Sequence, residues 1–186
     1  MKQQLKDRGG NKALVVIDVQ NGVVADGHDV NGVLSRIASL IAHAKSCEIP
    51  VVFVQHESDD LVPDTDSWQI RSEIAPTGAE PVIHKRFGDA FIETNFEETL
   101  ADLGVGHLVI TGAQTDACVR STLVGALRDG YDVTLVSDAH TTSDWEYRGV
   151  ESKAVDTIAR FNVEAGFIDY PNTESYVTDT DAVLSW

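Results

Sequence analysis

Three residues whose side chains can perform chemistry follow short apolar runs in this chain. Asp18 ends the run in VVIDVQNG, Lys85 follows VIH in VIHKRFGDAF, and Cys118 lies in ITGAQTDACVRST. A cysteine, a base and a cation together predict a nucleophilic site, because a free thiol has a pKa of about 8.5 and only the thiolate attacks well. Asp18 would accept the thiol proton and pass it to a leaving amine. Lys85 and the positive end of a helix that begins at Cys118 would favour the charged sulfur.

Each of these residues also has a structural interpretation. An aspartate at a strand end often caps a turn or helix, Lys85 is compatible with a surface lysine, and a lone cysteine is often a small buried apolar residue. Backbone N–H groups of Gln114 and Cys118, at a tight strand-to-helix turn, are candidate oxyanion donors. Cys47, in AHAKSCEIP at the end of an amphipathic pattern, has no such neighbours and is interpreted as structural. Both cysteines are expected to be free thiols.

The three residues can meet only if the fold gathers the ends of separate strands. Short β-branched apolar runs predict strands buried on both faces at 13–19, 51–55, 107–112 and 132–138, with weaker candidates at 82–84 and 166–168. Spacings of three and four predict helices over 33–44 and 119–127, and a third helix over 147–161. Residues 57–80 lack periodicity and are expected to form a long loop. The tail TDTDAVLSW carries the start signal of a short terminal helix.

This alternation predicts an α/β fold: a three-layer open sheet of about six parallel strands with helices on both faces. Ligands of such sheets bind at the carboxyl ends of the strands, where Asp18, Lys85 and Cys118 are all expected. The length of 186 residues, 42% of them hydrophobic, indicates a single domain over 1–186. Residues 1–12 are polar and are expected to be a flexible N-terminus.

The charge balance excludes some classes of function. Fourteen Lys and Arg against 30 Asp and Glu give a net charge of −16, which disfavours binding to nucleic acid or to an anionic membrane surface. No apolar run approaches the roughly 20 residues of a membrane-spanning helix, and the N-terminus has no apolar export signal. A cytoplasmic protein that acts on a small molecule is expected. The acidity leans only faintly toward a cationic substrate, because it also serves solubility.

With these residues in view, the chain resembles a known family. DVQN around Asp18, the lysine of HKRFGDAF, and GAQTDACVRST with the following GYDVTLVSDAHTTSD are similar to the isochorismatase-like cysteine hydrolases. That superfamily includes nicotinamidase and N-carbamoylsarcosine amidase. The likeness spans residues 13–170, with three separated motifs in the same order.

The resemblance implies a six-stranded parallel sheet and a catalytic triad of Asp18, Lys85 and Cys118. It also implies a non-proline cis peptide at Ala113–Gln114 that aims the Gln114 amide at the oxyanion, and a homo-oligomer, dimer or tetramer. In this interpretation Cys118 forms a thioester and releases ammonia or an amine. Isochorismatases proper, which cleave a vinyl ether, commonly lack the cysteine, so Cys118 favours C–N bond hydrolysis.

The sequence departs from the nicotinamidase pattern at its metal site. In VVFVQHESDD, His56 and Ser58 stand where the aspartate and histidine of the Asp-x-His set would fall. His56 and His84 remain near strand ends, but two histidines without a third spaced ligand do not make a typical zinc site. We therefore expect no metal and no cofactor, and nicotinamidase activity is disfavoured.

Substrate specificity is expected to come from the long loop and from residues at the edge of the site. Gln20, Trp68, Phe91 and Trp145 are predicted to contact substrate, with Phe87 as a further aromatic candidate. Apolar walls would suit a small planar amide. Relatives act on primary amides, ureido compounds and the lactam of streptothricin-type antibiotics, and the sequence does not rank these.

Other classes of protein fit the motifs less well. A receiver-like signalling domain needs paired acids after its first strand, whereas Asp18 has no acidic neighbour. The only G-x-G, Gly104 to Gly106, precedes a predicted strand and cannot place phosphate at a helix N-terminus. Two alternatives stay open: a family hydrolase of a non-amide substrate, and an inactive member that acts as a binding protein.

Overall fold

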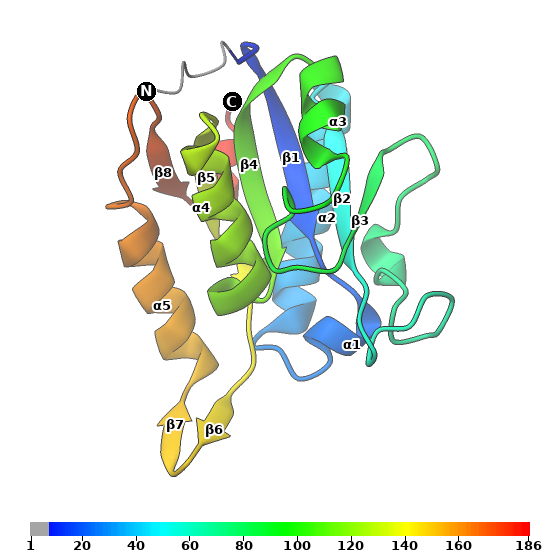
Figure 1. Cartoon of the computed structure of the whole chain (residues 1–186), viewed down its shortest axis with the longest axis vertical. Coiled ribbons are helices and arrows are strands. Elements are labelled where there is room, and N and C mark those ends of the chain that lie inside the picture. Colours follow the sequence, from blue (N-terminus) through cyan, green and yellow to red (C-terminus); the bar gives the residue numbers. More distant parts are fainter. Residues whose placement is uncertain (1–7) are drawn as a thin grey trace.

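The computed structural model describes residues 8–186 and is built on a six-stranded parallel sheet (Figure 1). The strand order is β3-β2-β1-β4-β5-β8, so β1 lies inside the sheet with β2 and β4 on either side. Both the strand number and the parallel pairing predicted from the sequence are confirmed. The strands are β1 (Asn11–Ile17), β2 (Val51–His56), β3 (Val82–Lys85), β4 (Val105–Ala113), β5 (Asp132–Thr141) and β8 (Ser175–Thr178).

Alternate side chains of β1 supply two separate apolar cores, one on each face of the sheet. Ala13, Val15 and Ile17 pack into one core, and Leu14 and Val16 pack into the other. All five are buried, which is why the run reads as continuously apolar and not as alternating.

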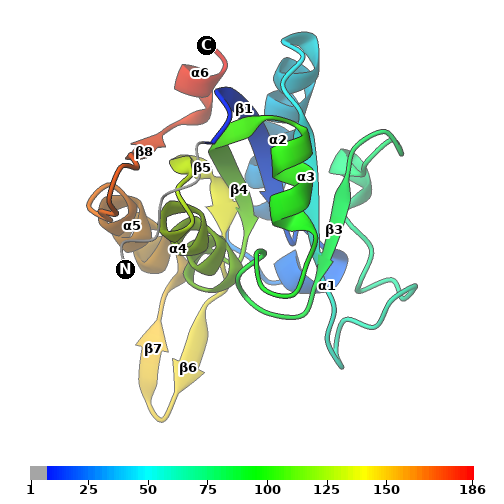
Figure 2. The same ribbon diagram turned by 45° about the horizontal axis from the view of Figure 1, so that its top comes forward.

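Helices cover both faces of the sheet, as Figures 1 and 2 show. Leu100 of α3, Leu123 of α4 and Phe161 of α5 belong to one core, whereas Ile37 of α2 and Val183 of α6 belong to the other. This layering confirms the predicted three-layer architecture. The helices are α1 (Asn21–Val24), α2 (Val30–Ser46), α3 (Phe96–Asp102), α4 (Arg120–Arg128), α5 (Ala154–Ala165) and α6 (Thr180–Val183).

The third helix, predicted over 147–161, begins only at Ala154, and an antiparallel hairpin forms in the segment before it. The strands β6 (Trp145–Tyr147) and β7 (Val150–Ser152) pair across a turn at Arg148 and Gly149, which both have positive φ angles, 53° and 79°. Aromatic and β-branched residues around a glycine turn favour a hairpin. The hairpin projects away from the sheet in Figure 2.

The predicted strand at 166–168 is also wrong. Gly166 caps the C-terminus of α5, and Phe167 is 82% exposed. The chain turns here, and the edge strand forms seven residues further on, where Ser175 to Thr178 pair with β5 from Val133 to Val136.

The remaining expectations on organisation have mixed outcomes. As expected, the loop over 57–80 has no helix or strand of its own apart from one 3₁₀ turn, Ser72–Ile74. The expected terminal helix also forms, and Asp179 accepts a hydrogen bond from the Ala182 N–H at its start.

The expectation of a flexible N-terminus is wrong for residues 8–12, because Arg8 donates to the Asp129 carbonyl and β1 begins at Asn11. Its first part, 1–7, lies outside the described residues. Between residues 8 and 186, no helix is both long and apolar enough to cross a membrane.

Candidate active site

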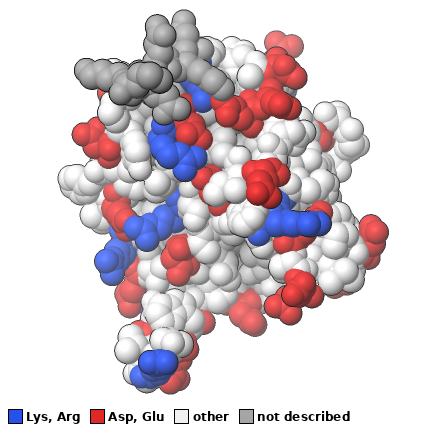
Figure 3. Space-filling model, viewed as in Figure 1, with Lys and Arg blue, Asp and Glu red and all other residues white. Residues whose placement is uncertain are grey.

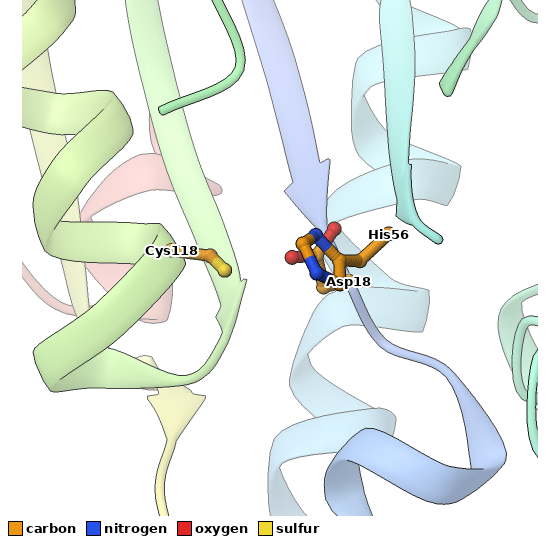
Figure 4. Close-up of side chains that lie close together, drawn as sticks. All are labelled: Asp18, His56 and Cys118. Carbon is orange, nitrogen blue, oxygen red and sulfur yellow. The ribbon is translucent and has the colours of Figure 1, made fainter. Parts of the chain in front are cut away.

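The sheet brings Asp18, Lys85 and Cys118 together at the carboxyl ends of β1, β3 and β4. The Lys85 Nζ lies 2.6 Å from Asp18 Oδ2 and 3.1 Å from Cys118 Sγ. Figure 4 shows the Asp18 and His56 side chains next to each other at the ends of β1 and β2, with the Cys118 thiol directed toward them. Residues separated by tens of positions therefore form one cluster, as the parallel topology requires.

Asp18 is held rigidly where β1 ends. Its backbone N–H donates to the Val54 carbonyl at 2.9 Å, and its φ of 49° lies in the left-handed region, which aspartate tolerates better than most residues. The side chain is almost fully buried. The carboxylate lies beside the Cys118 thiol and within hydrogen-bonding reach of it, so Asp18 is placed to accept the thiol proton.

Lys85 is a buried lysine at the end of β3, not a surface one. It is 2% exposed, and its ammonium also lies 3.0 Å from His56 Nδ1 and 3.1 Å from the Phe87 carbonyl. With Asp18 and Cys118 this makes four neighbours for a group with three protons. Lys85 therefore cross-links the site and supplies its positive charge.

Cys118 lies in a π-helical turn, Thr115–Val119, that leads into α4. The Gln114 carbonyl accepts from the Ala117 and Val119 N–H groups, each at 3.1 Å. The Thr115 hydroxyl bonds His140 Nδ1 at 2.9 Å and ties the turn to β5. π-Helical turns of this kind are frequent at functional sites.

Two backbone features precede this turn. The peptide bond between Ala113 and Gln114 is cis, where the family resemblance implies one. Gly112 has a φ of 119°, and a Cβ there would meet the Ile17 carbonyl oxygen at 2.0 Å. Only glycine allows β4 to approach the end of β1 this closely.

The surroundings of Cys118 act against the thiolate that the sequence led us to expect. Burial, followed by the negative charge of Asp18, raises the pKa of Cys118 to about 12. Lys85 acts in the opposite direction but does not offset these two effects. The Lys85 ammonium forms an ion pair with Asp18, so the negative charge of that carboxylate largely cancels the stabilisation that Lys85 would give to a thiolate at Cys118.

Burial also raises the pKa of the Asp18 carboxyl, while Lys85 holds it down. A carboxylate with a raised pKa is a better proton acceptor than one in water. The cluster thus combines a protonated nucleophile with a base of increased strength beside it, and it can transfer the thiol proton when an electrophile reaches the sulfur.

Removing Lys85 should strongly destabilise the protein. We expect Lys85→Met to lower the free energy of unfolding by about 3–5 kcal/mol at neutral pH, because the Asp18 charge is left buried and unpaired. Without Lys85 the pKa of Asp18 rises further, and a folded-state pKa above the unfolded one adds stability at low pH that is lost as pH rises. The deficit should therefore shrink as pH falls toward about 4 in urea unfolding.

The matched control removes both charges at once. The double variant Asp18→Asn/Lys85→Met should recover most of the lost stability at neutral pH. An equal deficit in the single and double variants would contradict the assignment of Asp18 and Lys85 as a buried ion pair.

Asp18, His56 and Cys118 also have the donor types of a metal site. One donor atom from each lies within 4.8 Å of the others. The Lys85 ammonium, however, contacts all three of these residues, at 2.6, 3.0 and 3.1 Å. Burial and Lys85 lower the pKa of His56. A metal would have to displace the ammonium, so the donor set does not fit a resident cation.

A pocket of about 330 Å³ opens over the Cys118 thiol. It is bordered by Asp18, His56 and Cys118 and by two neighbouring segments. Its other lining residues include Gly22, Val23, Ser58, Asp60, Leu61 and Gln114. The volume suits a small molecule.

The four residues predicted to contact substrate do not line this pocket. Gln20 is fully buried and exchanges hydrogen bonds with the backbone of His56, at 2.8 and 2.9 Å, so it positions the end of β2. Trp68 stacks on His84 with ring centres 5.6 Å apart. Phe91 packs between Phe96 and Tyr131.

Trp145, the fourth, lies on the projecting hairpin and is 47% exposed. It borders a separate hollow against α5, together with Arg160 and Glu164. Phe87 contributes its backbone carbonyl to Lys85 and is itself 44% exposed. Aromatic residue type alone was therefore a poor guide to the pocket wall, because most of these rings pack elsewhere.

Sequence reasoning underrated His56, and it expected the loop over 57–80 to set specificity without singling out Ser58, Asp60 and Leu61 as its part of the pocket wall. His56 was considered only as a metal ligand, whereas the structure makes it the third neighbour of Lys85 and part of the pocket wall. Its position as the last residue of β2 is the signal that pointed to the site. Ser58, Asp60 and Leu61 lie in an irregular loop, for which periodicity carries no information.

Comparison with known proteins confirms the resemblance. The family model for the isochorismatase domain matches residues 12–163. Streptothricin hydrolase of Streptomyces noursei is 32% identical over 139 residues, 72% of this chain and 55% of that protein. The chain thus spans little more than half the length of this relative. Ureidoacrylate amidohydrolase of Pseudomonas syringae is 25% identical over 207 residues, 89% of this chain and 82% of that protein.

Solved structures agree with the sequence comparisons. An isochorismatase from Pseudomonas putida superposes with a TM-score of 0.80 at 25% identity and covers 92% of this chain and 89% of its own. An isochorismatase family protein from Burkholderia thailandensis has a TM-score of 0.74 at 25% identity, with coverages of 95% and 96%.

Proposed function

This chain belongs to the isochorismatase family, and from the site it carries we propose that it is a cysteine-dependent amidohydrolase. It cleaves a C–N bond of a small amide, ureido or lactam substrate through a thioester on Cys118. The observation that carries the proposal is the contact of one buried ammonium, Lys85, with both the Asp18 carboxylate and the Cys118 sulfur. The names of two relatives, streptothricin hydrolase and ureidoacrylate amidohydrolase, favour C–N hydrolysis.

Acylation begins with a proton transfer inside the cluster. As the substrate carbonyl carbon approaches, the Cys118 thiol proton moves to the Asp18 carboxylate and the sulfur bonds to carbon. The carbonyl electron pair moves onto oxygen, where the backbone N–H groups of Gln114 and Cys118 are the proposed donors. The C–N bond then breaks, Asp18 returns the proton to nitrogen, and ammonia or an amine leaves.

Deacylation repeats the same steps with water. Asp18 takes a proton from a water molecule whose oxygen attacks the thioester carbon. When the C–S bond breaks, the sulfur recovers that proton through Asp18, and a carboxylic acid is released. Lys85 stays an ammonium throughout and offsets negative charge on Asp18 and on the sulfur in turn.

A panel of small primary amides, ureido compounds and lactams tests the proposal. Turnover is followed by enzyme-coupled detection of ammonia, and by mass detection of the acid product for lactams and secondary amides. We expect hydrolysis of at least one compound class by the wild type. A vinyl ether is tested beside the panel: its cleavage with no turnover of any amide would show a non-amide hydrolase, and binding without turnover would show an inactive family member.

Chelation should leave the activity unchanged. Because the Lys85 ammonium occupies the space between the three possible metal donors, incubation with EDTA and gel filtration should change kcat by less than about twofold. Metal content measured on the same sample provides the control. Activity that disappears and returns only with added zinc would contradict this prediction.

A further inference from the structure

The charged groups around the pocket are unevenly distributed. Among its lining residues the only charged side chains are the carboxylates of Asp18 and Asp60, and none is Lys or Arg. Lys85 lies behind the thiol with its charge paired to Asp18 at 2.6 Å. The site therefore carries one negative charge, on Asp60, that forms no ion pair with any residue from 8 to 186.

The two carboxylates of the pocket differ in their partners. Asp18 is 1% exposed, and its carboxylate is engaged by Lys85 and Cys118. Asp60 is exposed, and no ion pair or hydrogen bond joins its carboxylate to the part of the chain that the structure describes. A tight turn fixes the backbone on either side of Asp60, with mutual bonds between Ser58 and Leu61 at 3.1 and 3.3 Å.

The loop segment around Asp60 adds further negative charge next to the pocket. Residues 57–66, ESDDLVPDTD, contain five acids and no base. Glu57 is the one of these acids that forms ion pairs with basic side chains of residues 8–186, with His84 at 3.5 Å and with Arg86 at 3.6 Å. Over the whole face seen in Figure 3, acidic side chains are widely spread and basic ones are confined to a few places.

His56, the remaining polar group of the wall, adds no positive charge. Its Nδ1 accepts from the Lys85 ammonium at 3.0 Å, which leaves Nε2 as the protonated nitrogen of a neutral ring. Burial and the neighbouring ammonium both lower the pKa of His56, so the ring stays neutral at physiological pH. An anionic substrate would therefore find no positively charged partner among the residues that line this pocket.

We propose that the pocket over Cys118 selects substrates that carry a positive charge, an ammonium or guanidinium group outside the scissile amide, and rejects anionic ones. This inference rests on the proposed function and specifies its substrate class. Asp60 binds the cation at the pocket rim while the amide carbonyl reaches the sulfur. The acidic rim raises the local concentration of such molecules, as charged clefts do for ligands of opposite sign.

The charge preference can be measured without a known substrate, because Cys118 reports on its own pocket. The probes are three methanethiosulfonate reagents of similar size, of which one carries an ammonium, one carries a sulfonate and one is uncharged. Their rates of modification at Cys118 and at the exposed Cys47 are read from the two cysteine peptides by mass spectrometry. Cys47 corrects for the intrinsic reactivity of each reagent.

At low ionic strength we expect the ratio of cationic to anionic rates to be at least about tenfold larger at Cys118 than at Cys47. The difference should shrink in about 0.5 M salt, which screens charge beyond a few ångströms. Asp60→Asn should reduce the ratio severalfold and Asp60→Lys should reverse it. Asp102→Asn, an equal change of charge on α3, should leave it unchanged.

Equal ratios at the two cysteines, or a ratio insensitive to Asp60→Lys, would overturn the inference. The outcome is independent of catalysis, because disulfide formation with these reagents needs no hydrolysis. If the ratio of cationic to anionic rates is the same at Cys118 and Cys47 and neutral amides are hydrolysed, the preference for cationic substrates is wrong and the proposed amidohydrolase activity stands. If modification of Cys118 is charge-selective but no amide is hydrolysed, the proposed activity is wrong and the pocket only binds cations. Matched amides then complete the test: β-alaninamide should be hydrolysed faster than propionamide, and succinamate not at all.

Discussion

Replacing Cys118 by alanine should abolish amide hydrolysis, with kcat/KM reduced by at least about a thousandfold. Cys118 is the only thiol among the described residues that line the pocket, and the proposed mechanism uses Asp18 as the proton acceptor, so the variant loses the group that forms the covalent intermediate. The side chain is small and lies at the pocket wall, so its loss should leave the fold intact. Circular dichroism and urea unfolding check this on the same sample.

Cys47→Ala provides the matched control for that variant. Cys47 is exposed at the end of α2, far from the triad in the chain. It should keep wild-type turnover within about twofold, as surface substitutions usually do. Hydrolysis by Cys118→Ala at a rate near that of the wild type would rule out the covalent mechanism.

Replacing Asp18 by asparagine should separate thiol reactivity from catalysis. The variant loses the group that accepts and returns the proton, so turnover should fall by about a hundredfold to ten-thousandfold. At the same time the thiol should become more reactive, because Asp18 raises the pKa of Cys118. With the carboxylate removed, the Lys85 ammonium remains 3.1 Å from a sulfur that has no other charged neighbour.

Iodoacetamide alkylation at Cys118, read by peptide mass, measures this second effect. In the wild type, with the pKa of Cys118 raised to about 12, the rate should rise about tenfold per pH unit between about pH 7 and 10. Asp18→Asn should react about tenfold faster than the wild type near pH 8. Slower alkylation in the variant would show that Asp18 activates the thiol before substrate binds, contrary to the electrostatics described above.

The sequence predicted the parts of this molecule that depend on burial of regular elements. The runs at 13–19, 51–55, 107–112 and 132–138 became strands because each buries apolar side chains on both faces of the sheet. Together with the weaker candidate at 82–84, these parallel strands place Asp18, Lys85 and Cys118 at the same edge of the sheet. The family resemblance added the position of the cis peptide at Ala113–Gln114.

What could not be predicted depends on contacts between distant segments. Part of the pocket wall comes from residues 58–61 of the loop that was expected to set specificity, but which residues of that loop reach the pocket follows from its own turn and not from periodicity. Trp68 was expected at the site as an aromatic residue of its edge, and Phe91 because the family pattern supports a pocket-side position there. Stacking on His84 and packing against Tyr131 place these two rings elsewhere. The state of the Cys118 thiol depends on the balance of burial, Asp18 and Lys85, and only the three-dimensional arrangement shows that burial dominates.

The central claim, a thioester on Cys118, is tested most directly by the mass of the enzyme during turnover. The wild type is mixed with the most active amide of the panel, quenched in acid within milliseconds to seconds, and weighed intact and as peptides. We predict an added mass equal to the substrate minus its amine, located on the Cys118 peptide, removed by hydroxylamine and absent from Cys118→Ala. Release of ammonia with no such adduct at any quench time, and with turnover retained in Cys118→Ala, would contradict the account.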